Sequence, residues 1–511
     1  RLWRSLRAMI KAIDRFLDHL TMYRLVLYYL TSLLATALAF SLVKLVPYDP
    51  LALAFTSVLT LAACWVTNKV FELVFEVPAN SESVYITALI LALILDPVAA
   101  TDLKGIGAVA FASVWAIASK FILAIGRKHL FNPAALGVAL SALLLDKPAT
   151  WWVGGNLWLL PFVLLGGILV MRKLRRLDLV APVVTVALLT ILATTEPSLY
   201  GATLNETLTS SPLLFFAFVM LTEPLTAPTT RWPRLAFAAI VGFLFAPNVH
   251  IGSFYLTPEL ALLAGNLFAY AAGPKGRLVL TLERVERSAS DSYDFIFRSP
   301  RKLAFEAGQY LEWTLGLSRS DNRGNRRYFT IASAPTEEAV RLGVKFYSRS
   351  SAFKRELIAM KPGSRIHAAQ LAGNFTLPAR RETKVAFLAG GIGITPFRSM
   401  LQYLLDRGEK RPIIVLYGTE HQKDIAYRDV LDAARRELEI RTIHAVAQGA
   451  ERGQYPGYID RRLIEIAVPD YLERTFYISG PQAMVKLLGR QLRAMGVRRS
   501  RIKVDYFPGF A

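Results

Sequence analysis

KVAFLAGGIGITP (384–396) decides the fold of the C-terminal half of this chain. A short apolar strand pattern is followed by a glycine-rich turn and then by a helix pattern. Glycines let the backbone approach a dinucleotide pyrophosphate closely, and the N-terminus of the following helix presents unpaired amides to it. The strand-to-helix order returns at PIIVLYGT (412–419) and RTFYISG (474–480). We therefore expect a parallel α/β sheet over 381–511 that binds a dinucleotide.

Alternating strand patterns such as RLVLTLERVE (277–286) precede this sheet and predict a β-barrel over 277–380. An arginine can pair with a pyrophosphate, an aromatic ring can pack on a flavin, and a hydroxyl can bond the flavin N5 region. The barrel carries these residue types in Arg327-Tyr328-Phe329-Thr330 at a strand end, and Gly373-Asn374-Phe375 closes the barrel about forty-five residues later.

The combination resembles the ferredoxin:NADP reductase superfamily, which implies bound FAD and NADH or NADPH. In that resemblance YISGPQAM (477–484) corresponds to a Cys-Gly-Pro motif, with Ser479 in place of the cysteine. Hydride transfer needs no covalent role for that residue, so activity is still expected. The resemblance also implies that Phe507 or Phe510, near the end of the sequence, covers the flavin ring until nicotinamide displaces it. The catalytic residues implied are Thr330, Ser479 and Phe510.

Two further features bear on the cofactors. The segment SRSSAFKREL (348–357) begins a helix, so Ser350 or Ser351 should cap it and offer amides to the FAD phosphates; a plain N-cap is the alternative. Glu420 could accept ribose hydroxyls and so favours NADH, whereas Lys423 and Arg428 favour NADPH. Other expected cofactor contacts are Gly390, Gly391, Gly393, Thr395, Pro396, Gly480 and Pro481.

The N-terminal half is more apolar and carries less charge. Of 511 residues 53% are hydrophobic, and residues 1–275 carry a net charge of +6 against +15 for residues 276–511. Apolar runs predict about ten membrane crossings. Several runs are short, which indicates a cavity or neighbouring protein at their ends. The runs are 24–46, 50–75, 84–98, 105–125, 134–145, 156–171, 179–194, 212–222, 234–246 and 258–272.

Lysine and arginine gather on one side of these crossings. The loops on one side of the predicted crossings contain fourteen lysines and arginines, and those on the other side contain two or three. Because the cytoplasmic side is the positive one, the N-terminus and the FAD/NAD half are both expected in the cytoplasm. The loop 195–211 would then lie outside. Residues 1–23 alternate apolar and basic residues at helical spacing, which predicts an interfacial amphipathic helix rather than a signal peptide.

Three membrane segments carry a second resemblance. SESVYITALILALILDP (81–97), SKFILAIGRKHLFNPAALGVAL (119–140) and VMLTEPLTAPTT (219–230) resemble the RnfD membrane protein of Rnf electron-transport complexes and its counterpart NqrB in the sodium-pumping NADH:quinone reductase. Over 24–272 this implies ten helices in two inverted halves, a bacterial cytoplasmic (inner) membrane and bound flavin. It also implies FMN esterified to an outer threonine, here Thr203; noncovalent flavin, or none, is the alternative.

Ionisable or polar residues near the ends of these runs are costly in a bilayer and favour contact with a cofactor over ion transport. The single cysteine, Cys64, excludes a cysteine-ligated iron-sulfur cluster within this chain. His129 and His250 are wrongly placed for stacked haems, which leaves flavin as the membrane carrier. The residues expected to contact the membrane flavin are Lys120, Asn132, Thr203, Thr222 and Glu223.

These features together predict a transmembrane flavoprotein oxidoreductase. Electrons from cytoplasmic NADH would pass through FAD and a membrane flavin to an unknown acceptor at the outer face. Two alternatives stay open: an NADH:quinone reductase in the membrane, perhaps coupled to an ion, and a non-catalytic subunit or anchor of a larger electron-transport complex. The basic charge is assigned to dinucleotides, so no nucleic-acid partner is expected.

Overall fold

The computed structural model divides the chain into two compact units, Arg1–Gly276 and Arg277–Ala511. We describe each unit by itself. The predicted interfacial helix at 1–23 lies mostly outside the described residues, as do Phe507 and Phe510. The described residues are 13, 17, 20–75, 81–125, 128–174, 176–228, 231–272, 278–316, 325–347 and 350–505.

The first unit consists of apolar helices. Each of the ten predicted runs contains a helix, but only three described helices, α2, α3 and α5, are long and apolar enough to cross a membrane by themselves. The count of ten crossings is therefore not confirmed. The helices are α2 (Met22–Leu42), α3 (Pro50–Phe75), α4 (Ser81–Ile94), α5 (Leu103–Ile122), α6 (Pro133–Leu145), α7 (Leu160–Leu174), α8 (Leu177–Ala193), α9 (Tyr200–Thr209), α10 (Leu213–Phe215), η2 (Phe216–Met220), α11 (Arg231–Phe245) and α12 (Pro258–Ala272).

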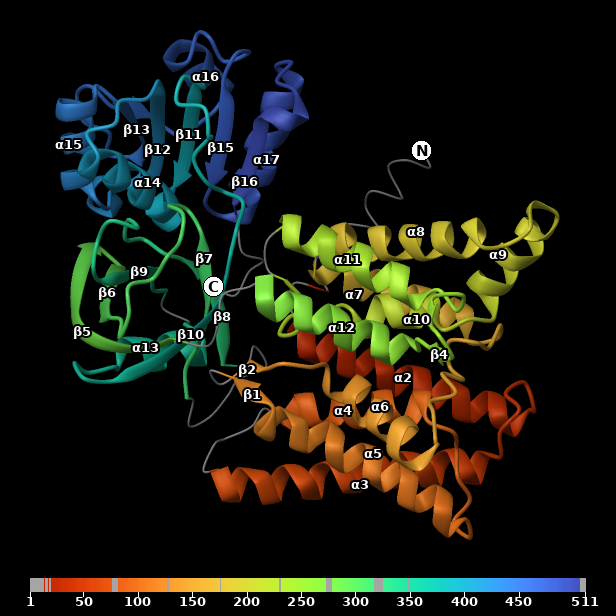
Figure 1. The fold of residues 1–511 in the computed structure, drawn as a ribbon. Helices are drawn as coiled ribbons and strands as arrows, with labels where there is room; N and C mark the ends of the chain where they lie inside the picture. The colour runs from red at the N-terminus through yellow and green to blue at the C-terminus, as the bar shows by residue number, and fades with distance from the viewer. Residues whose placement is uncertain are drawn as a thin grey trace. The chain divides into compact units, whose positions relative to one another are not determined.

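Two small hairpins mark a repeat in this unit. Hairpin β1–β2 (Ala124–Ile125, Lys128–His129) separates α5 from α6, and hairpin β3–β4 (His250–Ile251, Phe254–Tyr255) separates α11 from α12. They lie at opposite ends of the helices (Figure 1), as an inverted repeat requires. A proline begins the helix after each hairpin, so Thr257-Pro258 is the counterpart of Asn132-Pro133.

Segment 195–211, expected to be an outer loop, is largely helical. It contains α9, so that Thr203 lies in the first turn of a helix and is partly exposed. After α9 the chain enters the unit's core through α10 and the wide π turn η2, where Phe215, Phe216 and Met220 are buried. A wide turn of this kind interrupts regular helix packing and is frequent at functional sites.

The second unit begins with the expected antiparallel barrel. Its six strands run in the order β8-β7-β10-β5-β6-β9, and their alternation buries a core that includes Trp313, Phe295 and Phe297. The bounds are β5 (Leu278–Ala289), β6 (Ser292–Arg298), β7 (Tyr310–Thr314), β8 (Arg326–Thr330), β9 (Val340–Lys345), α13 (Ala352–Ile358) and β10 (Arg365–Ala372).

The remainder is the expected parallel sheet, with strand order β14-β13-β12-β11-β15-β16. Helices α14 and α15 pack on one face, and α16 and α17 pack on the other (Figure 1). The bounds are β11 (Val385–Gly390), η3 (Gly391–Ile394), α14 (Thr395–Asp406), β12 (Ile413–His421), η4 (Gln422–Asp424), α15 (Arg428–Leu438), β13 (Arg441–Gln448), β14 (Tyr455–Pro456), α16 (Arg461–Ala467), β15 (Thr475–Ser479), α17 (Gln482–Ala494), η5 (Arg499–Arg501) and β16 (Ile502–Asp505).

Buried polar contacts join the barrel to the sheet within this unit. The Tyr427 hydroxyl, at the start of α15, donates to Asp294 Oδ1 on β6 at 2.6 Å. Arg341 on β9 pairs with the other oxygen of Asp294 at 2.8 Å. Only 1% of Asp294 is exposed, so these bonds form where water does not compete for them. They hold the barrel and the sheet in one orientation.

Candidate functional site

The glycine-rich turn after β11 is shaped by a close contact between two loops. A Cβ placed on Gly393 would lie 2.5 Å from Gly480 Cα, so the turn after β11 and the turn after β15 meet backbone to backbone. Gly391 has a φ of +51°, and nothing lies within 4 Å of the position that a Cβ would take on it, which leaves open space over the turn.

Two helix N-termini converge on this turn. Helix α14 begins at Thr395, and Pro396 is its second residue. Both residues are buried. Helix α17 begins directly after Pro481, an exposed residue that follows Gly480. Unpaired amides of a helix N-terminus favour anions. The predicted dinucleotide contacts at 390–396 and 480–481 are therefore brought together, and phosphate binding there stays a prediction.

Alternate residues of β8 face different surroundings. Arg327 is buried, and its guanidinium lies 5.4 Å above the ring of Phe353, a residue of α13. The Phe329 ring also contacts Phe353, with centroids 6.0 Å apart. Ser351 caps α13 by accepting a bond from Lys354 N, as expected for one of the two serines. The predicted pyrophosphate arginine and the capped helix are thus neighbours.

The other predicted serine and the exposed tyrosine have partners of their own. Ser350 donates through Oγ to Tyr347 O at 2.6 Å, which draws its hydroxyl into the preceding turn. The Tyr328 hydroxyl donates to Glu312 Oε2 at 2.7 Å, and 38% of the residue is exposed. Tyr328 therefore presents a fixed ring at the surface of β8, where a planar ligand could pack on it.

Thr330 at the end of β8 meets a residue that the sequence analysis missed. Its hydroxyl donates to Asp505 Oδ2 at 3.4 Å, and burial raises the pKa of Asp505 to about 7. Asp505 ends β16 and is paired in register with Ser479, which ends β15. Two of the three predicted catalytic residues, Thr330 and Ser479, are therefore neighbours of Asp505, Thr330 through its hydroxyl and Ser479 through the strand pairing. An acidic residue just before the aromatic C-terminal segment was the available signal.

The three residues of the second barrel motif, Gly373-Asn374-Phe375, have different environments. Gly373 adopts a φ of +120°, and its carbonyl accepts a bond from Gln309 Nε2 at 3.3 Å. Asn374 is exposed. Phe375 is buried, with its ring 5.6 Å from that of Phe397 and 5.1 Å from that of Tyr477. Phe375 thus packs the barrel against the sheet, whereas Gly373 and Asn374 form the turn.

Glu420 is held in place at the carboxyl end of β12. Its two oxygens accept bonds from Gln448 Nε2 at 2.8 Å and from the Tyr458 hydroxyl at 2.9 Å. The Tyr458 ring is 65% exposed, and the bond to Glu420 raises the pKa of its hydroxyl. Arg428 donates to Gln422 O at 3.0 Å. A fixed carboxylate beside an exposed ring suits the hydroxyls and base of an adenosine.

A polar cluster joins the two halves of the helical unit. Asn132, before α6, donates to Glu223 Oε2 at 2.8 Å, and His129 contacts the other oxygen of Glu223 at 3.1 Å. Asn266 on α12 accepts from Asn132 N at 2.8 Å and donates to Thr226 O at 3.2 Å. The predicted pair Asn132 and Glu223 is brought together, while His129 and Asn266 are members that the sequence analysis missed.

The other predicted membrane residues make no described hydrogen bond to this cluster, although Thr222 is next to Glu223 in the sequence and the charge of Lys120 interacts with that of Glu223. Lys120 on α5 donates to Thr87 Oγ1 at 2.9 Å and to Ser83 Oγ at 3.1 Å, so it joins α5 to α4. The Thr222 hydroxyl turns back to Phe218 O at 2.8 Å. Thr203 lies on α9, which packs on α8 and α10. No described contact links these three residues into one site.

Two family profiles and several relatives match the chain. The reductase subunit of glycine betaine monooxygenase from Pseudomonas aeruginosa is 25% identical over 247 residues, which cover 45% of this chain and 64% of that subunit. The chain thus spans less than two thirds of that relative. The stachydrine N-demethylase reductase subunit from Rhizobium meliloti is 28% identical over 242 residues, which cover 45% of this chain and 68% of that subunit.

Solved structures align with a similar share of the chain. The FAD/NAD-binding domain of a nitric oxide dioxygenase from Vibrio cholerae aligns with a TM-score of 0.41 and 19% identity, covering 45% of this chain and 98% of that one. A ferredoxin NADP+ reductase from Neisseria gonorrhoeae, with bound FAD and NADP, aligns with a TM-score of 0.39 and 18% identity, covering 45% and 98%.

The family profiles match separate segments. One describes the NQR2, RnfD, RnfE family and the other the oxidoreductase NAD-binding domain. Each falls in a different compact unit. Residues 153–271 match the profile of the NQR2, RnfD, RnfE family and residues 387–489 match that of the oxidoreductase NAD-binding domain, so both resemblances seen in the sequence are confirmed.

Proposed function

We propose that this chain is an NAD(P)H-dependent flavoprotein oxidoreductase of a bacterial cytoplasmic membrane. It would take electrons from cytoplasmic NADH and pass them through FAD and a membrane flavin to an acceptor at the outer face. FAD, when bound, supplies the conversion of a two-electron hydride donor into single electrons. The presence in one chain of an oxidoreductase NAD-binding segment and an NQR2, RnfD, RnfE segment supports electron transfer from NADH to the membrane unit.

One chain of contacts carries the proposal. Gly393 touches Gly480, Ser479 is paired in register with Asp505, and Asp505 is bonded to Thr330. A nicotinamide dinucleotide held at the glycine turn would thus lie beside a flavin held by β8. Hydride transfer requires donor and acceptor atoms about 3–3.5 Å apart, so adjacent binding sites on one rigid unit are what the reaction needs.

The residues of the flavin side would have distinct roles. Arg327 and the amides at the start of α13 would hold the pyrophosphate, because both the charge and the unpaired donors suit an anion. Tyr328 would pack on the ring from the surface of β8. Thr330 would direct its hydroxyl to the flavin N5 region, and Asp505 would set which way that hydroxyl points.

NADH is the favoured donor because of Glu420. Gln448 and Tyr458 fix its carboxylate in position, so the carboxylate can accept the two ribose hydroxyls and would repel a 2′-phosphate. Of the two basic residues expected to oppose this preference, Arg428 is turned to a backbone carbonyl.

In the membrane unit, the cluster around Glu223 is the best candidate for holding a flavin. Amide, imidazole and carboxylate groups offer both donors and acceptors there, and the wide turn η2 precedes it. FMN carried on Thr203 is a further part of the proposal, and it would place a second carrier on α9. Acid-stable fluorescence of the denatured chain, lost in Thr203→Ala, would support that part.

The direction of transfer has a direct test. The purified chain is reconstituted in vesicles with NADH outside and an impermeant acceptor trapped inside. Reduction of the trapped acceptor, dependent on NADH and on oriented protein, is expected. If NADH is oxidised with a soluble acceptor outside but the trapped acceptor stays oxidised, outward transfer is wrong. Failure to oxidise NADH with any acceptor would instead indicate a non-catalytic subunit.

A second candidate is an NADH:quinone reductase with its quinone in the membrane. The buried polar cluster next to η2 favours it, because a quinone carbonyl would find donors there. Quinone-dependent NADH oxidation in vesicles without any trapped acceptor would support this candidate. A change of that rate on adding an ionophore would further show coupling to an ion.

A further inference from the structure

A stretch near the end of the described residues carries an unusual run of charge. Between Thr475 and Val504 there are seven lysines and arginines and no aspartate or glutamate. This stretch includes helix α17 and the turn η5, on the sheet face that α16 also covers. The basic residues are Lys486, Arg490, Arg493, Arg498, Arg499, Arg501 and Lys503.

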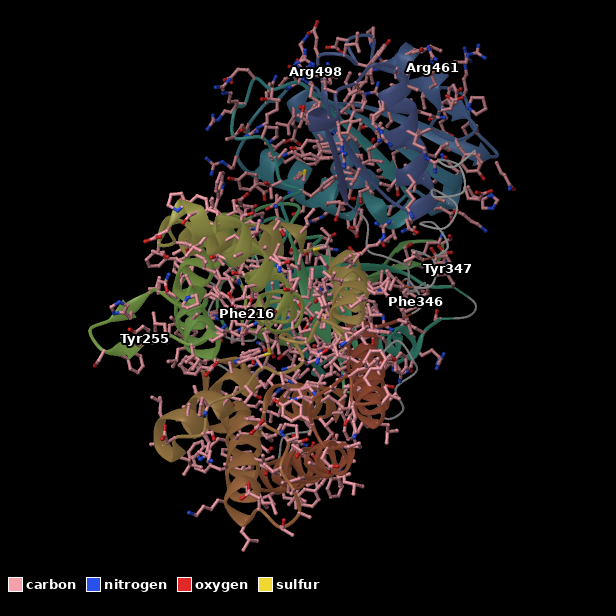
Figure 2. All side chains as sticks on the ribbon, turned by 90° about the vertical axis from the view of Figure 1, so that its right-hand side faces the viewer. Phe216, Tyr255, Phe346, Tyr347, Arg461 and Arg498 are labelled. Carbon is pink, nitrogen blue, oxygen red and sulfur yellow. The ribbon has the colours of Figure 1, made fainter. Side chains whose placement is uncertain are left out.

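The helix separates these charges from its apolar side. Val485, Leu488 and Leu492 are buried against the sheet. Lys486, Arg490 and Arg493 follow one another at intervals of four and three residues, so they share the opposite side of the helix, and all three are exposed. Figure 2 shows Arg498 and Arg461 on the outside of the same domain. We call the five exposed residues Lys486, Arg490, Arg493, Arg498 and Arg499 the α17 face.

No carboxylate neutralises the α17 face among the described residues. Arg490 and Arg493 donate instead to carbonyls of their own helix, at 3.2 and 2.9 Å. The other sheet face differs: α15 carries three arginines, Arg428, Arg435 and Arg436, and three acidic residues. The charge of the α17 face is therefore uncompensated, whereas that of α15 is nearly balanced.

Exposed apolar side chains accompany these charges. Leu487 is 50% exposed and lies directly beside Lys486 in the helix. Leu472 is 54% exposed and lies next to the end of α17, because its carbonyl accepts from Arg501 and its side chain faces Gly496. Basic residues mixed with exposed leucines are typical of surfaces that rest in the headgroup layer of a membrane.

We propose that the α17 face docks on the anionic phospholipid surface of the membrane that holds the helical unit. Its charge is complementary to acidic headgroups, and each lysine or arginine near such a surface adds attraction. Five residues, 273–277, separate the end of α12 from β5. Five residues span at most about 18 Å when extended, so a membrane that holds α12 would be within reach of the second unit.

This docking does not depend on the redox reaction. It requires only that the chain sits in a membrane with acidic lipid on the side of the second unit. An acidic protein is the other partner that uncompensated arginines could bind. The leucines and the short covalent tether favour lipid, because the bilayer needs no separate encounter.

The test uses the full chain in nanodiscs, with a bimane label on Leu487→Cys. The native Cys64 is buried, and the unsubstituted chain gives the background labelling. Brominated lipids quench a label that rests in the headgroup layer. We expect quenching in discs of phosphatidylglycerol and phosphatidylcholine, loss of it in phosphatidylcholine alone, and loss of it in molar salt, which cuts the Debye length to about 3 Å.

Two charge variants form a matched pair. Arg490→Glu with Arg493→Glu should abolish the quenching, whereas Arg435→Glu with Arg436→Glu, the same change on α15, should retain it. Both should still oxidise NADH with a soluble acceptor, which shows that they fold. Quenching that is equal in neutral and anionic discs would overturn the proposal. So would a label that stays open to aqueous iodide in every disc, an outcome that points to an acidic protein.

Discussion

At the scale of single residues, Asp505 gives the clearest pH dependence. Its pKa lies near 7 because burial disfavours the carboxylate. Below that pH the acid is neutral and Thr330 can direct its proton elsewhere; above it the carboxylate holds the Thr330 hydroxyl at 3.4 Å. We expect the NADH oxidation rate to fall as pH rises through 7. The matched variant Asp505→Asn should give a flat profile, and an unchanged inflection would exclude Asp505 as its source.

The same residue affects stability with a defined sign. A carboxyl group with a raised pKa binds its proton more tightly in the folded than in the unfolded state. The protonated Asp505 therefore stabilises the folded state. This stabilisation is fully present below pH 3.8, the ordinary pKa of an aspartate, and is lost as the pH rises to about 7. Thermal unfolding of the second unit should shift to lower temperature over that interval. In Asp505→Asn this part of the shift should disappear.

Glu420 sets the expected choice of coenzyme. Removing a hydrogen bond to a charged group costs about 1.5–3 kcal/mol, which is about ten- to a hundredfold in kcat/KM for NADH. Glu420→Gln should show that loss and should narrow the preference over NADPH. Tyr458→Phe keeps the charge and removes one of its supports, so a smaller loss is expected. A Glu420→Gln enzyme with unchanged selectivity would contradict the assignment.

Local patterns predicted some of these residues and could not predict others. Ser351 was expected to cap α13 because a cap depends on the next three residues. Asp505 was missed because its partner Thr330 is 175 residues away. His129 and Asn266 were missed for the same reason, since Glu223 and Asn132 lie 94 and 134 residues from them. Charge and burial at such contacts depend on tertiary packing, which periodicity does not describe.

At the scale of elements, the meeting of two glycine turns should be sensitive to one methyl group. In Gly393→Ala the new Cβ would lie 2.5 Å from Gly480 Cα, and both sides are backbone. Overpacking of this kind costs about 1–3 kcal/mol. We expect a higher KM for NADH with normal FAD content. Gly489→Ala in α17 is the control, because nothing lies within 4 Å of its Cβ position. Equal KM values in the two variants would contradict the close contact.

Elements were predicted well where periodicity is strong and poorly where it is weak. The strand-to-helix order after 383 predicted the parallel sheet, because buried strands and amphipathic helices have distinct patterns. The segment 195–211 was expected to be a loop because it is polar, yet it forms α9. A helix on which only Thr207 is buried carries little apolar signal. The counterpart of Asn132-Pro133, Thr257-Pro258, is recognised only from its place after the second hairpin.

At the scale of the whole molecule, two activities should separate. Glu223→Gln keeps the size of the side chain but removes the charge that His129 and Asn132 contact at 3.1 and 2.8 Å. NADH oxidation with a soluble acceptor depends on the second unit and should be unchanged. Reduction of an acceptor trapped inside vesicles depends on the helical unit and should fall.

Glu72→Gln is the control for that experiment, because Glu72 pairs with Lys69 three residues earlier on the same helix. Its trapped-acceptor rate should match the unsubstituted chain. The comparison of Glu223→Gln with Glu72→Gln concerns flavin transfer, because a single cysteine cannot ligate an iron-sulfur cluster within this chain. If Glu223→Gln lowers both activities equally, the cluster supports folding and not transfer. If it lowers neither, the membrane flavin lies elsewhere, and Thr203→Ala becomes the variant that should block the trapped acceptor.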